Sequence, residues 1–191
     1  MKKINKIKFL KKYFEEFSEL IKFDDKKKKF IIELSNKIIS TNRRGGTVFI
    51  FGNGGSSATA AHISTDLVKN ARIKSLCLHD TAFLTCLTND YGYDKWIKKS
   101  IDYYITKKDL IILISSSGKS PNMILAAKEA NKKKIPLYSL TGMNRNNSLS
   151  KLSKKNFWVN SNSYNFIENA HMFILMSIVD LIIGKHIYPA K

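Results

Sequence analysis

Five short apolar runs limit the folds open to this chain, because none of them alternates with polar residues. They occupy residues 47–51, 76–78, 110–114, 137–140 and 157–159. Runs of Val, Ile and Leu without alternation are typical of strands buried on both faces, as in a parallel sheet. Segments with helical spacing follow several of them, at residues 57 onward, 81–87, 122–133 and 165–186. This order predicts an α/β fold, a three-layer sandwich with a central parallel sheet.

The N-terminal part has the pattern of two amphipathic helices. In residues 5–22 apolar side chains recur at helical intervals between lysines and glutamates, and Asp24 and Asp25 can cap a second helix. We therefore expect one domain over residues 1–191, with helices in residues 1–44 and an α/β core in residues 45–191. The apolar face of residues 5–22 needs a partner, and another subunit would supply one.

Two polar loops follow predicted strands and precede predicted helices. The first is Gly-Asn-Gly-Gly-Ser-Ser at residues 52–57, and the second is Ser-Ser-Ser-Gly-Lys-Ser-Pro at residues 115–121. The first matches neither a Walker loop nor the dinucleotide fingerprint. Four hydroxyls directly after a buried strand need hydrogen-bond partners, and free N–H groups at a helix start favour anions. The two loops together predict a phosphate site.

The chain carries 33 Lys and Arg against 15 Asp and Glu, a formal net charge of +18. The excess is spread along the sequence, without zinc-finger spacing or an aromatic RNA-binding signature. Solvated surfaces therefore explain it better than nucleic-acid binding, although a positive field would attract an anionic ligand. Cys77 and Cys86 lack CxxC spacing, which argues against a disulfide framework or a zinc knuckle.

No continuous apolar stretch reaches the roughly 18 residues of a membrane span. The basic N-terminus also lacks the apolar core of a signal peptide. We therefore expect a cytoplasmic protein without a membrane partner.

Taken together, the motifs resemble the SIS (sugar isomerase) domain family and, within it, the phosphoheptose isomerases. The resemblance rests on residues 52–62, 88–93, 115–122, 140–142 and 167–171. It implies a three-layer α/β fold and a homotetramer with active sites between subunits, in which the N-terminal helices help to form the assembly. It also implies an aldose–ketose isomerase acting on a phosphorylated sugar, most closely sedoheptulose 7-phosphate in heptose synthesis for surface polysaccharide. Such enzymes move a proton between neighbouring carbons through a cis-enediol.

The resemblance and the two loops together name the expected site residues. We expect substrate contacts from Asn53, Gly54, Gly55, Ser56, Asp90, Ser115, Ser116, Ser117 and Ser120. The resemblance implies a zinc ion, and His62, Asp66 and Glu168 stand at ligand positions. Because His62 and Asp66 are four residues apart, they share one helix face. Asp66 and Glu168 are the expected proton-transfer groups.

Three positions depart from the family pattern. Asp66 replaces a glutamate, Glu168 replaces a glutamine, and Met176 replaces the histidine that serves as acid and metal ligand. Methionine cannot transfer a proton, so His171, three residues after Glu168, is the candidate acid. The alternative is a SIS-fold protein that binds or senses a sugar phosphate without turnover.

Overall fold

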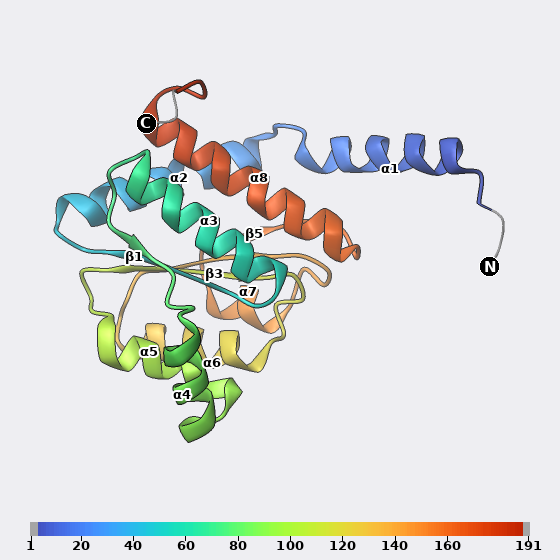
Figure 1. Ribbon diagram of the computed structural model, residues 1–191. Coiled ribbons are helices and arrows are strands. Elements are labelled where there is room, and N and C mark those ends of the chain that lie inside the picture. Colours follow the sequence, from blue (N-terminus) through green and yellow to red (C-terminus); the bar gives the residue numbers. More distant parts are fainter. Residues whose placement is uncertain (1–3, 189–191) are drawn as a thin grey trace.

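A five-stranded parallel sheet forms the centre of the computed structural model, which describes residues 4–188 (Figure 1). The strands are β1 (Val48–Gly52), β2 (Ser75–Leu76), β3 (Leu110–Ser115), β4 (Leu137–Thr141) and β5 (Asn156–Trp158). Their order is β2-β1-β3-β4-β5, and every neighbouring pair is parallel. The predicted fold class is therefore confirmed. The predicted span 1–191 extends three residues beyond the described range at each end.

The strand order places a topological switch point between β1 and β3. From β1 the chain moves outward to β2, then returns to the other side of β1 to form β3. The last residue of β1, Gly52, pairs with Ile114 of β3, and Ser115 pairs with Thr141 of β4. In open parallel sheets, ligands bind outside the carboxyl ends of the strands at such a point.

Helices cover both faces of the sheet, so the run 110–114 needs no alternation. One layer holds α2 (Asp25–Arg43), α3 (Gly55–Lys69) and α8 (Tyr164–Ile183). The other holds α4 (Thr81–Tyr91), α5 (Trp96–Tyr104), α6 (Pro121–Lys132) and α7 (Ser148–Leu152), with a short 3-10 turn at Tyr93–Lys95. Within β3, Leu110, Ile112 and Ile114 pack toward the first layer. Ile111 and Leu113 pack toward the second.

The first helix, α1 (Lys6–Ile21), projects away from the body of the molecule (Figure 1). None of its residues is buried. Near its C-terminal half, Tyr13 and Phe17 contact Phe166 of α8, with ring centroids 4.5 and 5.6 Å apart. The predicted helix is thus present, and most of its apolar face is free in the monomer.

Two differences from the expected elements concern helices. The sequence pattern did not predict α5 or α7. The last helix ends earlier than predicted, at Ile183, because Gly184 adopts a left-handed conformation with φ of 81°. His186 consequently lies beyond that helix.

Helix α8 bears on the expectation that no apolar stretch is long enough to span a membrane. It is long and apolar enough to cross a membrane by length and composition, with a mean hydropathy of 1.7. It packs against α2 and α3 in the core, however, and a core helix passes the same test.

Candidate active site

The turn from β1 into α3 forms one wall of the site. Gly54 has φ of 53° and ψ of −124°, a conformation that glycine adopts without the penalty other residues incur. The helix begins at the next residue, Gly55. This tight turn directs the first turn of α3 toward the carboxyl end of β3.

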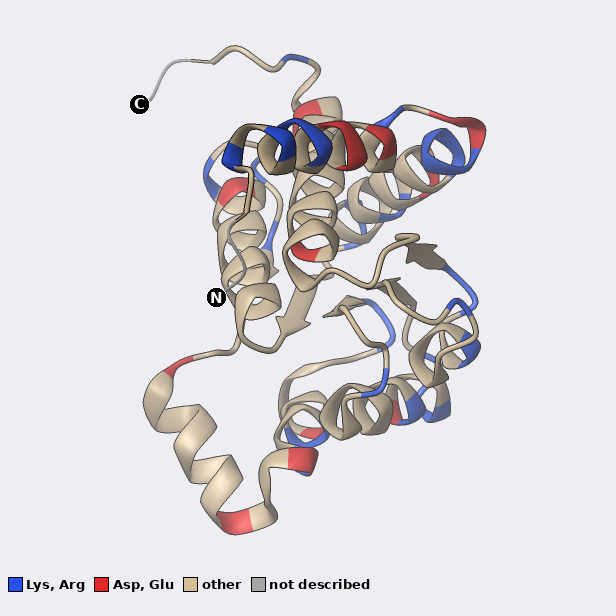
Figure 2. Ribbon diagram, turned by 90° about the vertical axis from the view of Figure 1, so that its right-hand side faces the viewer, with Lys and Arg blue, Asp and Glu red and all other residues tan. Residues whose placement is uncertain are grey.

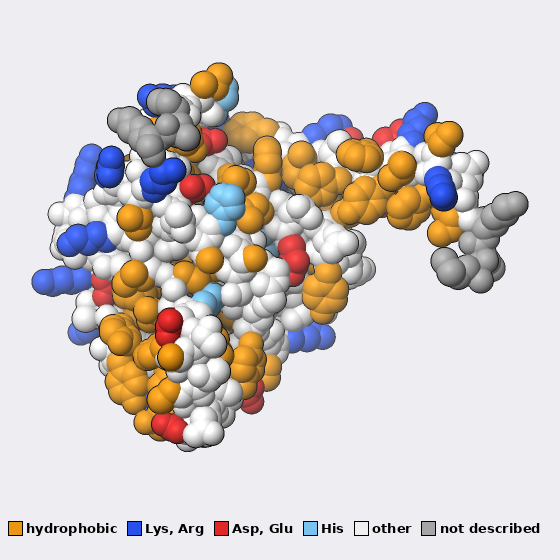
Figure 3. Space-filling view, in the orientation of Figure 1, with side chains coloured by type: hydrophobic (Ala, Val, Ile, Leu, Met, Phe, Trp, Pro, Cys, Tyr) orange, Lys and Arg blue, Asp and Glu red, His pale blue; other side chains and the backbone are white. Residues whose placement is uncertain are grey.

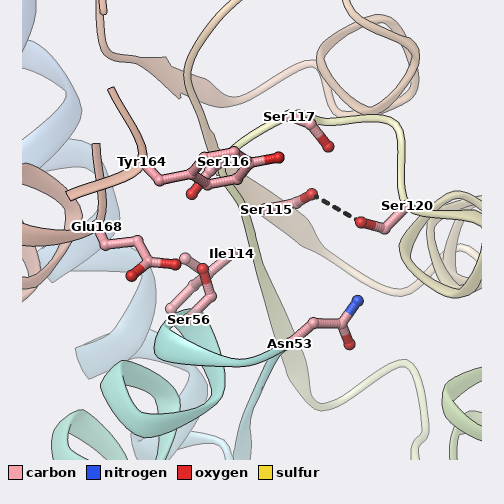
Figure 4. Close-up of a pocket in the computed structure, with 9 residues that line it drawn as sticks. All are labelled: Asn53, Ser56, Ile114, Ser115, Ser116, Ser117, Ser120, Tyr164 and Glu168. Atoms are coloured by element: carbon pink, nitrogen blue, oxygen red, sulfur yellow. Dashed lines mark hydrogen bonds between the residues drawn. The ribbon is translucent and has the colours of Figure 1, made fainter. Parts of the chain in front are cut away.

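The turn from β3 into α6 forms the facing wall. Ser115 ends the strand, and α6 begins at Pro121. Proline suits this first helical position because its fixed φ matches the helix and no N–H is lost from the ladder. The serine-rich residues 116–120 lie between them and face the β1–α3 turn (Figure 4).

A pocket of about 100 Å³ lies between these walls. Figure 4 shows the residues that line it: Asn53, Ser56, Ile114, Ser115, Ser116, Ser117, Ser120, Tyr164 and Glu168. Small-molecule pockets commonly measure about 300–1,000 Å³. The pocket therefore has room for a phosphate group, whereas the rest of a sugar would extend beyond it.

The two helices that begin at the pocket differ from most others at their N-termini. Helices α1, α2, α4, α7 and α8 each start with a side-chain cap hydrogen bond. Gly54 and Ser120, the N-caps of α3 and α6, make no such bond. The N–H groups of Ser56 and Ser57 donate to the Asn53 carbonyl, and α6 begins with a proline. The positive ends of the two helix dipoles face the pocket, which favours an anion.

One hydroxyl group in the pocket lacks a hydrogen-bond partner, and two others share only a long contact. The Ser116 Oγ is buried without a hydrogen-bond partner, and burying such a group costs free energy unless something satisfies it. Ser115 and Ser120 are joined by a long contact of 3.5 Å between their hydroxyls. The predicted serine cluster is thus brought together with Asn53 and Ser56, and it is suited to bind phosphate oxygens.

Glu168 and Tyr164 enter the pocket from α8 (Figure 4). The Glu168 carboxylate lies against the first turn of α3, so closely that a Cβ on Gly55 would be 2.7 Å from its Cδ. Among the lining residues, Glu168 is the one carboxylate. Tyr164 was not among the predicted site residues, although its spacing of four residues from Glu168 on one helix face signals a shared surface.

A hydrogen-bonded cluster holds Asn53 in place. Its amide exchanges two bonds with the amide of Asn122, at 2.9 and 3.1 Å, and its Oδ1 accepts a bond of 3.0 Å from the Tyr93 hydroxyl. Asn122 is buried and also accepts from the N–H of Met123. Asn122 and Tyr93 therefore position a pocket amide. Their sequence separation from Asn53 hid this role.

His62 and Asp66 lie together on α3, with 3.3 Å between Nε2 and Oδ2, as their spacing predicts. Neither lines the pocket that contains Glu168. Within residues 4–188, no group of three His, Cys, Asp or Glu side chains is arranged to hold a metal ion. These three residues therefore do not fit the implied zinc ion as a complete set within one chain.

Two predicted site residues, His171 and Asp90, lie outside the lining of the pocket, as does Met176 at the position of the family's histidine. His171 is fully buried, its Nε2 is 3.1 Å from the carbonyl of Thr141, and burial lowers its pKa to about 4. Asp90 is exposed on α4, which stands apart from the sheet at the lower left of Figure 2. Met176 packs against the core layer of α2, α3 and α8. The structure thus places none of them beside Glu168 in the pocket.

His79 and Cys77 form a separate contact near the β1–α3 turn. The His79 Nδ1 lies 2.6 Å from the Ser57 hydroxyl and 3.0 Å from the Cys77 sulfur. Burial lowers the pKa of His79 and raises that of Cys77 to about 12. Both groups are therefore neutral near pH 7, which suits the packing of the His79 ring beside Phe51 and Trp96.

Sequence comparison gives the chain clear relatives. The family model described as "SIS domain" matches residues 12–142. A phosphoheptose isomerase of Geobacter sp. (strain M21) is 30% identical over 151 residues, which cover 76% of this chain and 78% of that protein. Phosphoheptose isomerase 1 of Campylobacter jejuni is 28% identical, and the match covers 92% and 97% of the two chains.

Solved structures agree on the fold. A phosphoheptose isomerase from Francisella tularensis superposes with a TM-score of 0.84 at 22% identity, covering 95% of this chain and all of that one. The phosphoheptose isomerase GmhA from Neisseria gonorrhoeae gives a TM-score of 0.79 at 24% identity, with 91% and 99% covered. At these identities the likeness establishes the architecture, whereas the chemistry depends on the residues of the site.

Proposed function

The chain belongs to the SIS domain family, and we propose that it is a phosphosugar isomerase of the phosphoheptose type. It converts the ketose sedoheptulose 7-phosphate to the aldose D-glycero-D-manno-heptose 7-phosphate in the cytoplasm, for surface-polysaccharide synthesis. The observation that carries the proposal is the pocket itself. Serine hydroxyls and two uncapped helix N-termini suited to a phosphate face the carboxylate of Glu168. The isomerase relatives supply the reaction class.

The proposed reaction uses Glu168 as the base. The phosphate binds to the serine hydroxyls near the positive ends of the two helix dipoles, which fixes the sugar chain relative to α8. Glu168 takes a proton from C1 of the ketose, a cis-enediol forms, and the same carboxyl group returns the proton to C2. Meanwhile O1 loses its hydroxyl proton and O2 gains one, so the atoms balance. The Tyr164 hydroxyl on the same wall can donate a hydrogen bond to the oxygen that becomes charged.

The alternative, a sugar-phosphate-binding protein without turnover, is not favoured. It rested on Met176, which occupies the position of the family's histidine and cannot transfer a proton. A single carboxylate can move a proton between adjacent carbons on one face of an enediol, so Glu168 makes the reaction feasible without that histidine.

Zinc remains a prediction from the family resemblance. His62 and Asp66 form a close pair on α3 but are not assembled with Glu168 into a three-ligand group. Activity measured after dialysis against a chelator, and again after zinc is restored, tests this prediction.

We also propose a homotetramer in which α1 lies between subunits. Its side chains Ile7, Leu10 and Phe14, spaced by three and four residues, are 82, 51 and 67% exposed. Figure 3 shows this apolar surface along the projecting helix. Because the pocket holds only part of a sugar, a neighbouring subunit would complete the site. Light scattering of wild type and of Phe14→Asp tests the assembly, and the variant should dissociate.

Proton NMR in deuterated water tests the isomerase proposal. Purified protein and sedoheptulose 7-phosphate should give the aldose phosphate, with at least part of the transferred hydrogen retained rather than exchanged for deuterium. Glu168→Gln should keep phosphate binding and lose turnover. Ligand binding by wild type with neither product nor exchange would refute the proposal and restore the binding-protein alternative.

A further inference from the structure

A row of basic residues lies at the N-terminal ends of the strands, on the side of the sheet opposite the pocket. Five short segments lead into the five strands, at residues 43–44, 72–74, 107–108, 132–134 and 154–155. Each contains two or three Lys or Arg, eleven in total. We call this row the basic edge. Its members are far apart in the sequence, and the parallel sheet brings them together because all strands start at one edge.

Few of these charges are neutralised. Within residues 4–188, ion pairs reach two of the eleven: Lys133 with Asp102 at 2.7 Å, and Lys155 with Glu33 at 2.7 Å. The carboxylate beside the third segment, Asp109, is buried and accepts bonds from backbone N–H groups instead. Nine cations therefore lack an ion-pair partner among the described residues.

The positive charge of the row extends to a lysine beside it. Burial holds the pKa of Lys37, on α2, below its ordinary value, and the charge of Arg44 in the row lowers it further. Like charges gathered on one surface repel each other, so an anionic partner would relieve the repulsion.

The shape of the basic edge favours a linear polyanion. Neighbouring strands lie about 4.8 Å apart, so the five segments span roughly 19 Å. Figure 3 shows Lys and Arg side chains along the left flank, where the segments leading into the strands lie in Figure 1. Within the five segments no large apolar side chain is exposed. A membrane surface would therefore find nothing there to insert between lipids.

We propose that the basic edge binds the phosphate backbone of a nucleic acid without reading its sequence. The partner is recognised by charge and by the row's length, since phosphate contacts position a nucleic acid but do not specify bases. The pocket lies at the other edge of the sheet, so both ligands can be bound at once. This binding is independent of the isomerase activity.

A charge-reversal experiment with a matched control tests the proposal. The edge variant combines Lys74→Glu, Lys107→Glu and Lys154→Glu, three exposed side chains without ion pairs, in the segments before β2, β3 and β5. The control combines Lys26→Glu, Lys28→Glu and Lys29→Glu, which are exposed near the start of α2. Both variants change the net charge equally, so only the position of the lost charge differs.

Binding is measured by fluorescence anisotropy with a labelled single-stranded RNA of about 20 nucleotides, at several salt concentrations. We expect the edge variant to weaken binding at least tenfold and to lower the slope of log K against log salt by about 2, because three phosphate contacts contribute roughly 0.7 each. The control should stay within about threefold of wild type, since it leaves the row intact. Should the edge variant fail to fold, the corresponding glutamines replace the glutamates.

Two results would overturn the proposal. Equal weakening in the edge and control variants would mean that net charge alone attracts RNA. Binding of phosphatidylserine vesicles that depends on the edge residues, without binding of RNA, would assign the surface to a membrane.

Discussion

Replacing Gly55 by alanine separates the geometry of the site from the stability of the fold. A Cβ at this position would lie 2.7 Å from Cδ of Glu168 and 2.9 Å from its Oε1, where ordinary contact requires 3.4–4 Å. The Glu168 carboxylate must therefore shift by roughly 1 Å, and it can do so because it ends a flexible side chain. Gly55 is not among the residues with positive φ, so the backbone accepts alanine.

The expected result is a large loss of activity in a stable protein. A misplacement of about 1 Å can cost about 100-fold in rate, or close to 3 kcal/mol of activation free energy. Alanine is favoured over glycine in a helix by up to about 1 kcal/mol, so the free energy of unfolding should hold or rise. Steady-state kinetics with the ketose phosphate and denaturant unfolding measure the two effects on the same sample.

Gly184→Ala is the matched control. Gly184 follows α8 with φ of 81°, and a Cβ there would meet nothing within 4 Å. Alanine should lower the free energy of unfolding by about 1–2 kcal/mol through backbone strain and leave kcat unchanged. If Gly55→Ala kept kcat within about threefold of wild type, the position of the Glu168 carboxylate would not limit the reaction. Our assignment of Glu168 as the base would then be wrong.

Three other measurements follow from the structure. Ser116→Ala should raise the dissociation constant of inorganic phosphate about tenfold or more, because it removes a charge-assisted hydrogen bond. It should not destabilise the protein, because the hydroxyl has no partner without ligand. Calorimetry measures both the dissociation constant and the stability. Burial lowers the pKa of His171 from 6.5 to about 4. The stability that depends on its neutral form is therefore complete above pH 6.5 and falls as the pH drops toward 4, by about 3 kcal/mol in total; denaturant unfolding across this range should show the slope, and His171→Asn should lack it. Asn122→Ala should lower kcat/KM about tenfold by releasing Asn53, whose amide it holds, and an unchanged kcat/KM would contradict that positioning role.

Local patterns in the sequence predicted the architecture and the phosphate-binding walls. The run at residues 110–114 has no polar alternation because its side chains enter two different cores. The two glycine- and serine-rich loops follow adjacent strands, and the parallel register aligns their ends. Each of these properties depends on residues that are close in sequence, so it can be predicted from a single segment of the chain.

The parts that the sequence did not predict depend on contacts between distant segments. Tyr93 reaches Asn53 across 40 positions, and Asn122 reaches it across 69. The expected cluster of His62, Asp66 and Glu168 stays a prediction for a similar reason, since its assembly depends on how α3 packs against α8 and on the neighbouring subunits. The i, i+4 pair within α3 formed, whereas Glu168 lies against Gly55, about two turns before His62.

The net charge shows most clearly how the fold changes the meaning of a composition. Lysines spread along a sequence indicate solvated surfaces when each segment is considered alone. In a parallel sheet, however, the segments before the strands meet at one edge and those after the strands at the other. The cations of residues 43–44, 72–74, 107–108, 132–134 and 154–155 therefore become neighbours, at the edge away from the serine pocket. A positive field that served mainly to attract a sugar phosphate would be centred on the pocket. The basic edge lies on the opposite side of the sheet, and this position instead favours a second, larger anionic partner.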